Sequence, residues 1–206
     1  NKVLAGLNNP KTAIVVHNEK IGIFPIKLSQ NIVAVKINWY NRELLCINCY
    51  IPPTQELNPT LIEIAEVIEK YSSHNIIIAG DFNAKNHIWG GKQTDDKGIQ
   101  MAEFIITNNL KLLNQNKSLP TFETTNGKSW IDLSIVSNEL HSNTKTWEVL
   151  DDHSASDHRY IKLEFFTERH KDEIRLTKMG EFKLLEALSK DKWNGTPAHT
   201  IKTSIK

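Results

Sequence analysis

A carboxylate and an amide follow a short apolar run in the segment IAGDFNA, residues 78–84. The residues before them, NIIIAG at 75–80, are almost continuously apolar, which is typical of a strand buried on both faces. Asp81 and Asn83 lie two residues apart, so in extended backbone both side chains face the same side. A carboxylate suits a hard cation, and an amide can orient a water molecule or a phosphate. The pattern predicts a ligand site at the end of a central strand, with a simple turn as the alternative.

An adjacent acid and histidine, Asp157 and His158, occur immediately before the last predicted strand. The carboxylate could bind a metal or act as a base, and the imidazole can donate a hydrogen bond to a phosphate oxygen that gains charge. A single Asp-His pair is more often a solvated loop or a cap. The pair therefore points to a site only in combination with other groups.

An acid also interrupts an otherwise apolar strand, at Asp132 in SWIDLSI. A buried carboxylate costs free energy unless it is paired, and a histidine or a metal is a natural partner. We therefore expect Asp132 to pair with His158. Tyr50 ends another predicted strand before a double proline, and its phenol could reach a phosphate from there. Taken alone, a tyrosine at a strand boundary needs no functional explanation.

The elements that carry these groups predict a sheet-based α/β domain. Four strands rich in Val and Ile come first, and their short connections favour an antiparallel meander. Two amphipathic helices follow, one with Asn58 as its N-cap and one at about Gly98–Asn108. The predicted strands cover residues 12–17, 21–26, 31–38, 43–50, 75–80, 111–114, 121–124, 129–137, 144–150 and 159–166. Strands with interleaved helices favour an α/β fold whose outer faces are covered by helices.

The composition changes near Thr167, where alternating charges replace the strand patterns. A helical pattern of apolar residues follows around Phe182, Leu184, Leu185 and Leu188. We therefore expect one domain over residues 1–166 and a charged linker with an amphipathic helix over 167–206.

Length, charge and cysteine content exclude several classes of protein. The 206 residues carry 25 Lys and Arg against 24 Asp and Glu, so bulk charge predicts no nucleic-acid partner and any attraction must come from local patches. No apolar run reaches the ~18 residues of a membrane helix, and the N-terminus lacks a secretion signal. Cys46 and Cys49 lie on a predicted strand, facing opposite sides, so we expect two buried thiols and a reducing compartment. These features favour a non-secreted nuclear or cytoplasmic protein without a membrane partner.

In this order, three segments resemble the endonuclease/exonuclease/phosphatase superfamily. They are GDFNAKNHIWG at 80–90, LPTFETTNGKSWIDLSIVS at 119–137 and SASDHRYI at 154–161. Within that superfamily they look most like the apurinic-type endonuclease domain of non-LTR retrotransposons of the Jockey and R1 type, over about residues 10–166. The resemblance implies a four-layered α/β sandwich, in which two mostly antiparallel sheets are flanked by helices. The tail resembles the segment that leads to a reverse transcriptase domain.

The resemblance also implies a reaction and a role for each residue. The family nicks DNA phosphodiesters with Mg²⁺ or Mn²⁺, and in a retrotransposon the product 3′-OH primes reverse transcription. Tyr50 would hydrogen-bond the scissile phosphate, and Asp81 and Asn83 would position the attacking water. His158, oriented by Asp132, would contact a non-bridging phosphate oxygen. Asp157 would help to bind the metal or to activate the water.

Nearby side chains could contact the DNA itself. Trp89 could stack on a base, and His87 and Lys85 could reach backbone phosphates. The alternative for Trp89 is a packing role, and for any single lysine an ordinary solvated position is the simpler interpretation.

One part of the family pattern is missing. The family places a metal-binding Glu at the end of its second strand, whereas no Glu precedes Lys11 and Glu19 falls on a predicted turn. We therefore expect this chain to begin after that Glu and to lack the first strands of one sheet. The alternatives to a DNA endonuclease are a phosphomonoesterase or phospholipase of the same superfamily, and a catalytically dead remnant that binds DNA.

Overall fold

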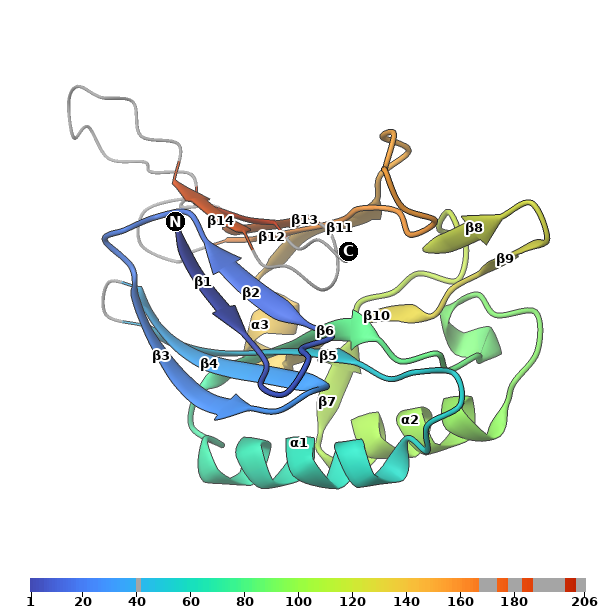
Figure 1. Cartoon of the computed structure of the whole chain (residues 1–206), viewed down its shortest axis with the longest axis horizontal. Helices are drawn as coiled ribbons and strands as arrows, with labels where there is room; N and C mark the ends of the chain where they lie inside the picture. Colours follow the sequence, from blue (N-terminus) through green and yellow to red (C-terminus); the bar gives the residue numbers. More distant parts are fainter. Residues whose placement is uncertain (40–41, 167–173, 178–182, 187–198, 203–206) are drawn as a thin grey trace.

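Two β-sheets pack face to face, and two helices cover the far side of one of them (Figure 1). The computed structural model describes residues 1–39, 42–166, 174–177, 183–186 and 199–202. The first sheet contains, in spatial order, β3 (Gly22–Leu28), β4 (Ile32–Trp39), β5 (Arg42–Tyr50), β6 (Asn75–Asp81), β10 (Asp132–Ser137) and β7 (Leu110–Leu112). The second contains β1 (Lys2–Ala5), β2 (Ala13–Val16), β14 (Lys183–Glu186), β15 (His199–Lys202), β13 (Ile174–Thr177), β12 (Ile161–Phe165) and β11 (Thr144–Val149).

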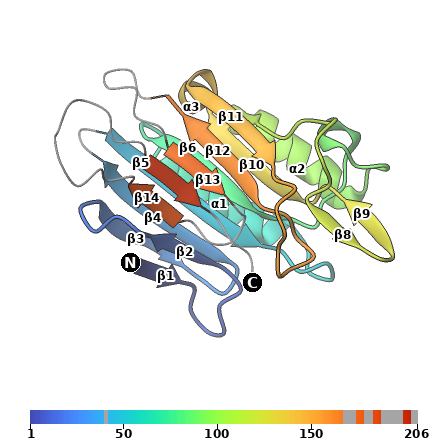
Figure 2. The ribbon, with the colours of Figure 1, turned by 90° about the horizontal axis from the view of Figure 1, so that it is seen from above.

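The remaining elements are helical segments and one small hairpin. The helices are α1 (Asn58–Lys70), α2 (Asp96–Thr107) and α3 (Asn138–Ser142), with a 3₁₀ turn η1 (His87–Trp89). Strands β8 (Phe122–Thr124) and β9 (Gly127–Ser129) pair with each other, and Figure 2 shows this hairpin projecting beyond the end of β10.

The central strands are buried on both faces and so separate two hydrophobic cores. Cys46 faces the core between the sheets, whereas Cys49, three residues later, faces the core beneath the helices. Ile77 and Ile78 of β6 alternate in the same way. Both cysteines are buried and free, as the sequence predicted.

The parallel pairing of β5 and β6 needs a crossover, and α1 provides it. Leu61, Ile64 and Ile68 recur on one face of α1 and are buried against the first sheet. Pro59 lies in the first turn of the helix, where its missing N–H costs nothing. The N-cap is Leu57 rather than the expected Asn58, so this boundary was wrong by one residue.

The two-sheet α/β architecture predicted from the sequence is confirmed, with pairings that are mostly antiparallel. Among the described residues, α1 and α2 cover the outer face of the first sheet. No helix within those residues has the length and apolar character to cross a membrane.

Two details of the expected organisation were wrong. The predicted four-stranded meander breaks at residues 17–21, because β2 pairs with β1 in the second sheet and only β3, β4 and β5 form the meander. A short link can join facing sheets as well as neighbouring strands. In the tail, Lys183–Glu186 forms β14 rather than part of a helix, since its backbone pairs with β2 and β15. Phe182 and Leu188 of the predicted helix lie outside the described residues, and the domain boundary near 167 stays a prediction.

Candidate active site

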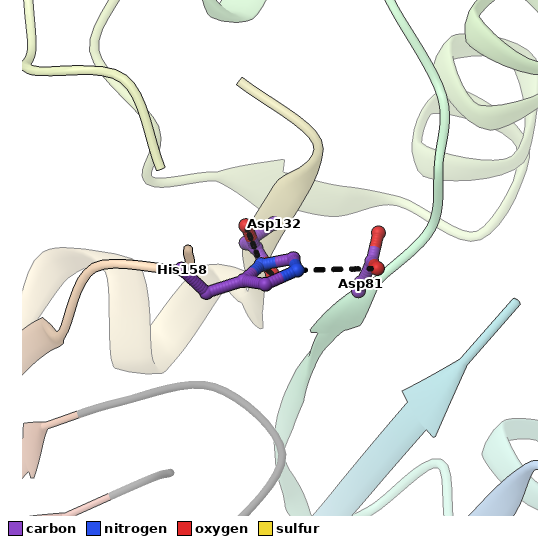
Figure 3. A group of neighbouring side chains, drawn as sticks. All are labelled: Asp81, Asp132 and His158. Carbon is purple, nitrogen blue, oxygen red and sulfur yellow. Dashed lines mark hydrogen bonds and ion pairs between the residues drawn. The ribbon is translucent and has the colours of Figure 1, made fainter. Parts of the chain in front are cut away.

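Three polar side chains stand in a row at one end of the first sheet. Asp81 ends β6, and the strand register places Tyr50 of β5 beside it on one side and Asp132 of β10 on the other. His158, from the loop before β12, reaches between the two aspartates (Figure 3). The topology therefore brings together residues that lie up to 108 positions apart in the sequence.

His158 and Asp132 form the pair that the sequence predicted. His158 Nδ1 lies 3.1 and 3.0 Å from the two carboxylate oxygens of Asp132, so this nitrogen carries the proton and donates it. Asp132 is fully buried and His158 is mostly so. Burial alone would lower the pKa of His158, but the hydrogen bond to Asp132 and the charges of Asp132, Asp81 and Asp157 outweigh it and raise the pKa. His158 is thus held in one orientation, in which its other nitrogen, Nε2, can contact a ligand.

Asp81 and Asn83 form a compact local unit. The Asn83 backbone N–H donates to Asp81 Oδ1 at 2.9 Å, and Asn83 Nδ2 donates to Asp81 Oδ2 at 3.0 Å. Nδ2 also donates to the Ile51 carbonyl at 2.9 Å. Asn83 has φ of 46°, a left-handed conformation that Asn tolerates better than most residues. Burial and the charge of Asp132 raise the pKa of Asp81 to about 7, although His158 and the Asn83 hydrogen bonds pull it down.

The site offers donors that suit a divalent cation. Asp81, Asp132 and His158 each present a possible ligand atom, and these atoms lie within 4.8 Å of one another. His158 Nε2 lies 4.0 Å from Asp81 Oδ2. Burial is the larger cause of the raised pKa of Asp81, and the negative charge of Asp132 adds to it, so a cation between the two carboxylates would be stabilising. The residues present therefore fit a metal by charge and by ligand type.

Two further predicted site residues flank this group. Tyr50 is partly buried, and burial together with the charge of Asp81 raises its pKa, so the phenol keeps its proton at neutral pH. Asp157 is exposed, and its carbonyl accepts a hydrogen bond from the Glu123 amide at 2.9 Å. The carboxylate of Asp157 does not belong to the three-residue group, so its role in metal binding stays a prediction.

The structure separates the three residues proposed to touch DNA. His87 is exposed on η1, where its Nδ1 lies 2.9 Å from the Gly91 carbonyl, and Lys85 is partly exposed. Trp89 is fully buried in the core beneath the first sheet, and its Nε1 donates to the Ala84 carbonyl at 3.1 Å. The expectation that Trp89 stacks on a base is therefore wrong, because no face of the indole reaches solvent. Its function is to anchor the loop that follows Asp81.

Two further contacts position the site. Phe122 of β8 forms a bridge with His158, and the two rings meet edge to face with centroids 4.8 Å apart. Lys97 of α2 donates to the carbonyls of Pro52 and Pro53, at 2.9 and 3.0 Å, and so holds the turn after Tyr50. Phe122 lies in the segment at 119–137 that resembles the family, but only the fold shows that its ring packs on the imidazole.

Known proteins match this chain in sequence and in fold. A curated relative, the retrovirus-related Pol polyprotein from type-1 retrotransposable element R1 of Bradysia coprophila, is 23% identical over 162 residues. The match covers 74% of this chain and 16% of that polyprotein, so the chain spans about a sixth of the curated relative's length.

Solved structures share the architecture. The endonuclease domain of TRAS1, a telomere-specific non-LTR retrotransposon, superposes with a TM-score of 0.73 at 23% identity, over 82% of this chain and 81% of that one. The apurinic endonuclease LMAP from Leishmania major superposes with a TM-score of 0.53 at 13% identity, over 66% and 55%. At these identities the likeness shows the fold.

The family model described as endonuclease-reverse transcriptase matches residues 44–162, which is more than half of the chain and includes Tyr50, Asp81, Asn83, Asp132 and His158. The chain therefore belongs to the endonuclease-reverse transcriptase family, the retrotransposon branch of the endonuclease/exonuclease/phosphatase superfamily that its motifs indicated.

Proposed function

We propose that this chain is a divalent-metal-dependent endonuclease that hydrolyses DNA phosphodiester bonds. The observation that carries the proposal is the convergence of Asp81, Asp132 and His158 at the sheet end where Tyr50 also lies. This end of the sheet combines one acceptor for a water proton, Asp81, with two hydrogen-bond donors to phosphate oxygens, His158 and Tyr50. Phosphoryl transfer depends mainly on this kind of positioning and charge stabilisation.

Asp81 and Asn83 would act on the nucleophile. The buried Asp81 carboxylate would accept a proton from the attacking water. The two hydrogen bonds from Asn83 fix the carboxylate, and the bond from Asn83 to Ile51 fixes the amide in turn. A water held by this unit would attack phosphorus in line with the leaving oxygen.

His158 and Tyr50 would act on the phosphate. Because Nδ1 of His158 is committed to Asp132, Nε2 is the nitrogen that can donate to a non-bridging oxygen. The Tyr50 hydroxyl would donate to the same phosphate from the neighbouring strand. The His158 donor is fixed by Asp132 before the substrate binds, which removes the cost of orienting it during the reaction.

Mg²⁺ or Mn²⁺ is the cofactor that this donor set suits best. We assign Asp157, together with the buried carboxylates of Asp81 and Asp132, as the residues that would hold it. When bound, the ion supplies positive charge to the oxygens that gain negative charge at the phosphorus. Lys85 and His87 would contact backbone phosphates beside the site.

The polyprotein setting of the relatives extends the proposal. We infer that the chain acts next to a reverse transcriptase domain in one polyprotein, that its 3′-OH product primes DNA synthesis, and that it works in the nucleus or cytoplasm. The matched R1 relative is a Pol polyprotein, which supports this setting.

Metal dependence gives the experiment that tests this proposal. Nicking of a labelled duplex is measured across a Mg²⁺ titration for the wild type and for Asp157→Ala, with Asp152→Ala, an exposed acid of the same loop, as the matched control. We expect Asp157→Ala alone to need more metal. Release of phosphate from p-nitrophenyl phosphate, without any cutting of the duplex, would instead support a phosphomonoesterase.

A further inference from the structure

Asp132, the first residue of β10, has a neighbouring strand on one side only. On the other side, side chains bind its backbone. Asp132 pairs with Asp81 of β6 on one side, but β7 on the other side begins its pairing with β10 only at Ile135. The Asn114 side chain takes the place of that strand, since its Nδ2 donates to the Asp132 carbonyl at 2.9 Å and its Oδ1 accepts from the Ser134 amide at 2.8 Å. The Asn114 side-chain amide thus satisfies both the Asp132 carbonyl and the Ser134 N–H on this side of β10.

Thr121 also binds the backbone at the start of β10. Its hydroxyl oxygen accepts hydrogen bonds from the backbone amides of Ile131 and Asp132, both at 3.1 Å. Its carbonyl accepts the backbone N–H of Arg159, the residue after His158, at 2.8 Å. Thr121 therefore touches the backbone on both sides of the Asp132–His158 pair.

Neither residue can reach a substrate. Thr121 is fully buried and Asn114 is 8% exposed. Every hydrogen bond named for them goes to backbone groups of β10, of Ile131 just before it, or of the His158 loop. An effect of either residue on a reaction at this site must therefore act through Asp132 and His158.

We propose that Asn114 and Thr121 are positioning residues for the reaction, and that they orient the Asp132 carboxylate against the imidazole of His158. The inference rests on the proposed endonuclease function for its kinetic consequence. Its structural consequence, the alignment of the Asp132–His158 hydrogen bond, does not depend on that function. A catalytic group displaced by ~1 Å can lose about 10²-fold in rate.

The test combines kinetics with a spectroscopic signal. Thr121→Val removes the hydroxyl at nearly constant volume, Thr121→Ser restores it, and Asn114→Ala breaks the other half of the arrangement. Thr60→Val is the matched control, because Thr60 is equally buried but lies in α1. Single-turnover nicking rate and DNA affinity are measured for each variant, below its own melting midpoint. The low-field NMR signal of the His158 Nδ1 proton is followed in the same samples.

We expect Thr121→Val and Asn114→Ala to nick about 10- to 100-fold more slowly with unchanged DNA affinity, and to lose or broaden the His158 signal. Thr121→Ser and Thr60→Val should behave as the wild type. If Thr121→Val does not fold, Asn114→Ala gives the same test independently.

A merely structural role predicts a different pattern. In a His158→Ala background, adding Thr121→Val should cost no further rate if Thr121 acts through His158, whereas an equal second loss would overturn the inference. Wild-type nicking with unchanged rates and signals in both variants would also overturn it and leave the proposed function intact. If the wild type does not nick, the function fails, and the His158 signal alone then decides whether the positioning role holds.

Discussion

The two halves of the candidate site are built in different ways. Asp81 and Asn83 are two residues apart and bind each other directly, so their geometry is set by one strand end and its turn. Asp132 and His158 are 26 residues apart and meet only because β10, the β8–β9 hairpin and the loop before β12 converge. The comparison shows that one half is encoded in a short motif, whereas the other half depends on tertiary packing.

The largest expected effect is on the half built by packing. His158→Ala removes the donor aimed at the phosphate, so we expect nicking to slow by about 10²- to 10⁴-fold, with unchanged far-UV circular dichroism. His153→Ala, an exposed histidine of the same loop, is the control and should cut at the wild-type rate. Equal rates for the two variants would remove His158 from the mechanism.

The local half depends on an anchor beneath it. Trp89→Ala should destabilise the protein by about 3–5 kcal/mol, because it empties a fully buried site in the core under the loop that follows Asp81. Chemical denaturation measures this loss. A change near zero would contradict the packing role of Trp89 and reopen a role at the surface.

The electrostatic cost of burying Asp81 should make the stability of the protein depend on pH. Since the pKa of Asp81 rises from 3.8 to about 7 on folding, the folded state holds a proton between these values that the unfolded chain has released. Asp81 therefore makes stability fall as pH rises through this window. In EDTA at pH 8, we expect the free energy of unfolding of Asp81→Asn to exceed that of the wild type by on the order of 2 kcal/mol, measured by denaturant titration. The advantage should vanish near pH 4, and one that persists there would have another cause.

The smallest effect concerns Lys85, a partly exposed residue beside the local half. Lys85→Ala should weaken DNA binding a few-fold and reduce the slope of log affinity against log salt by about 0.9, as expected for one lost phosphate contact. Lys70→Ala, at the end of α1, is the control. An unchanged slope for Lys85→Ala would show that Lys85 makes no contact with a DNA phosphate.

The same contrast explains what the sequence could predict. The motif around Asp81 and the apolar run of β6 located the local half, because both signals lie within a few residues. The pairing of Asp132 with His158 followed from the cost of a buried acid. Trp89 was ambiguous, because a tryptophan after a motif can pack or be exposed, and only the fold decides. The assignment of β2 to the second sheet and the contacts of Asn114 and Thr121 depend on pairings far apart in sequence, which residue patterns do not encode.

The most direct test of the central claim is relaxation of supercoiled plasmid by this chain in Mg²⁺ and in EDTA, beside His158→Ala and Asp132→Asn. We expect the wild type to produce nicked circles in Mg²⁺ only, and both variants to produce few or none. An intact plasmid in Mg²⁺ and in Mn²⁺, or full cutting by the two variants, would contradict the assignment of this sheet end as an endonuclease active site.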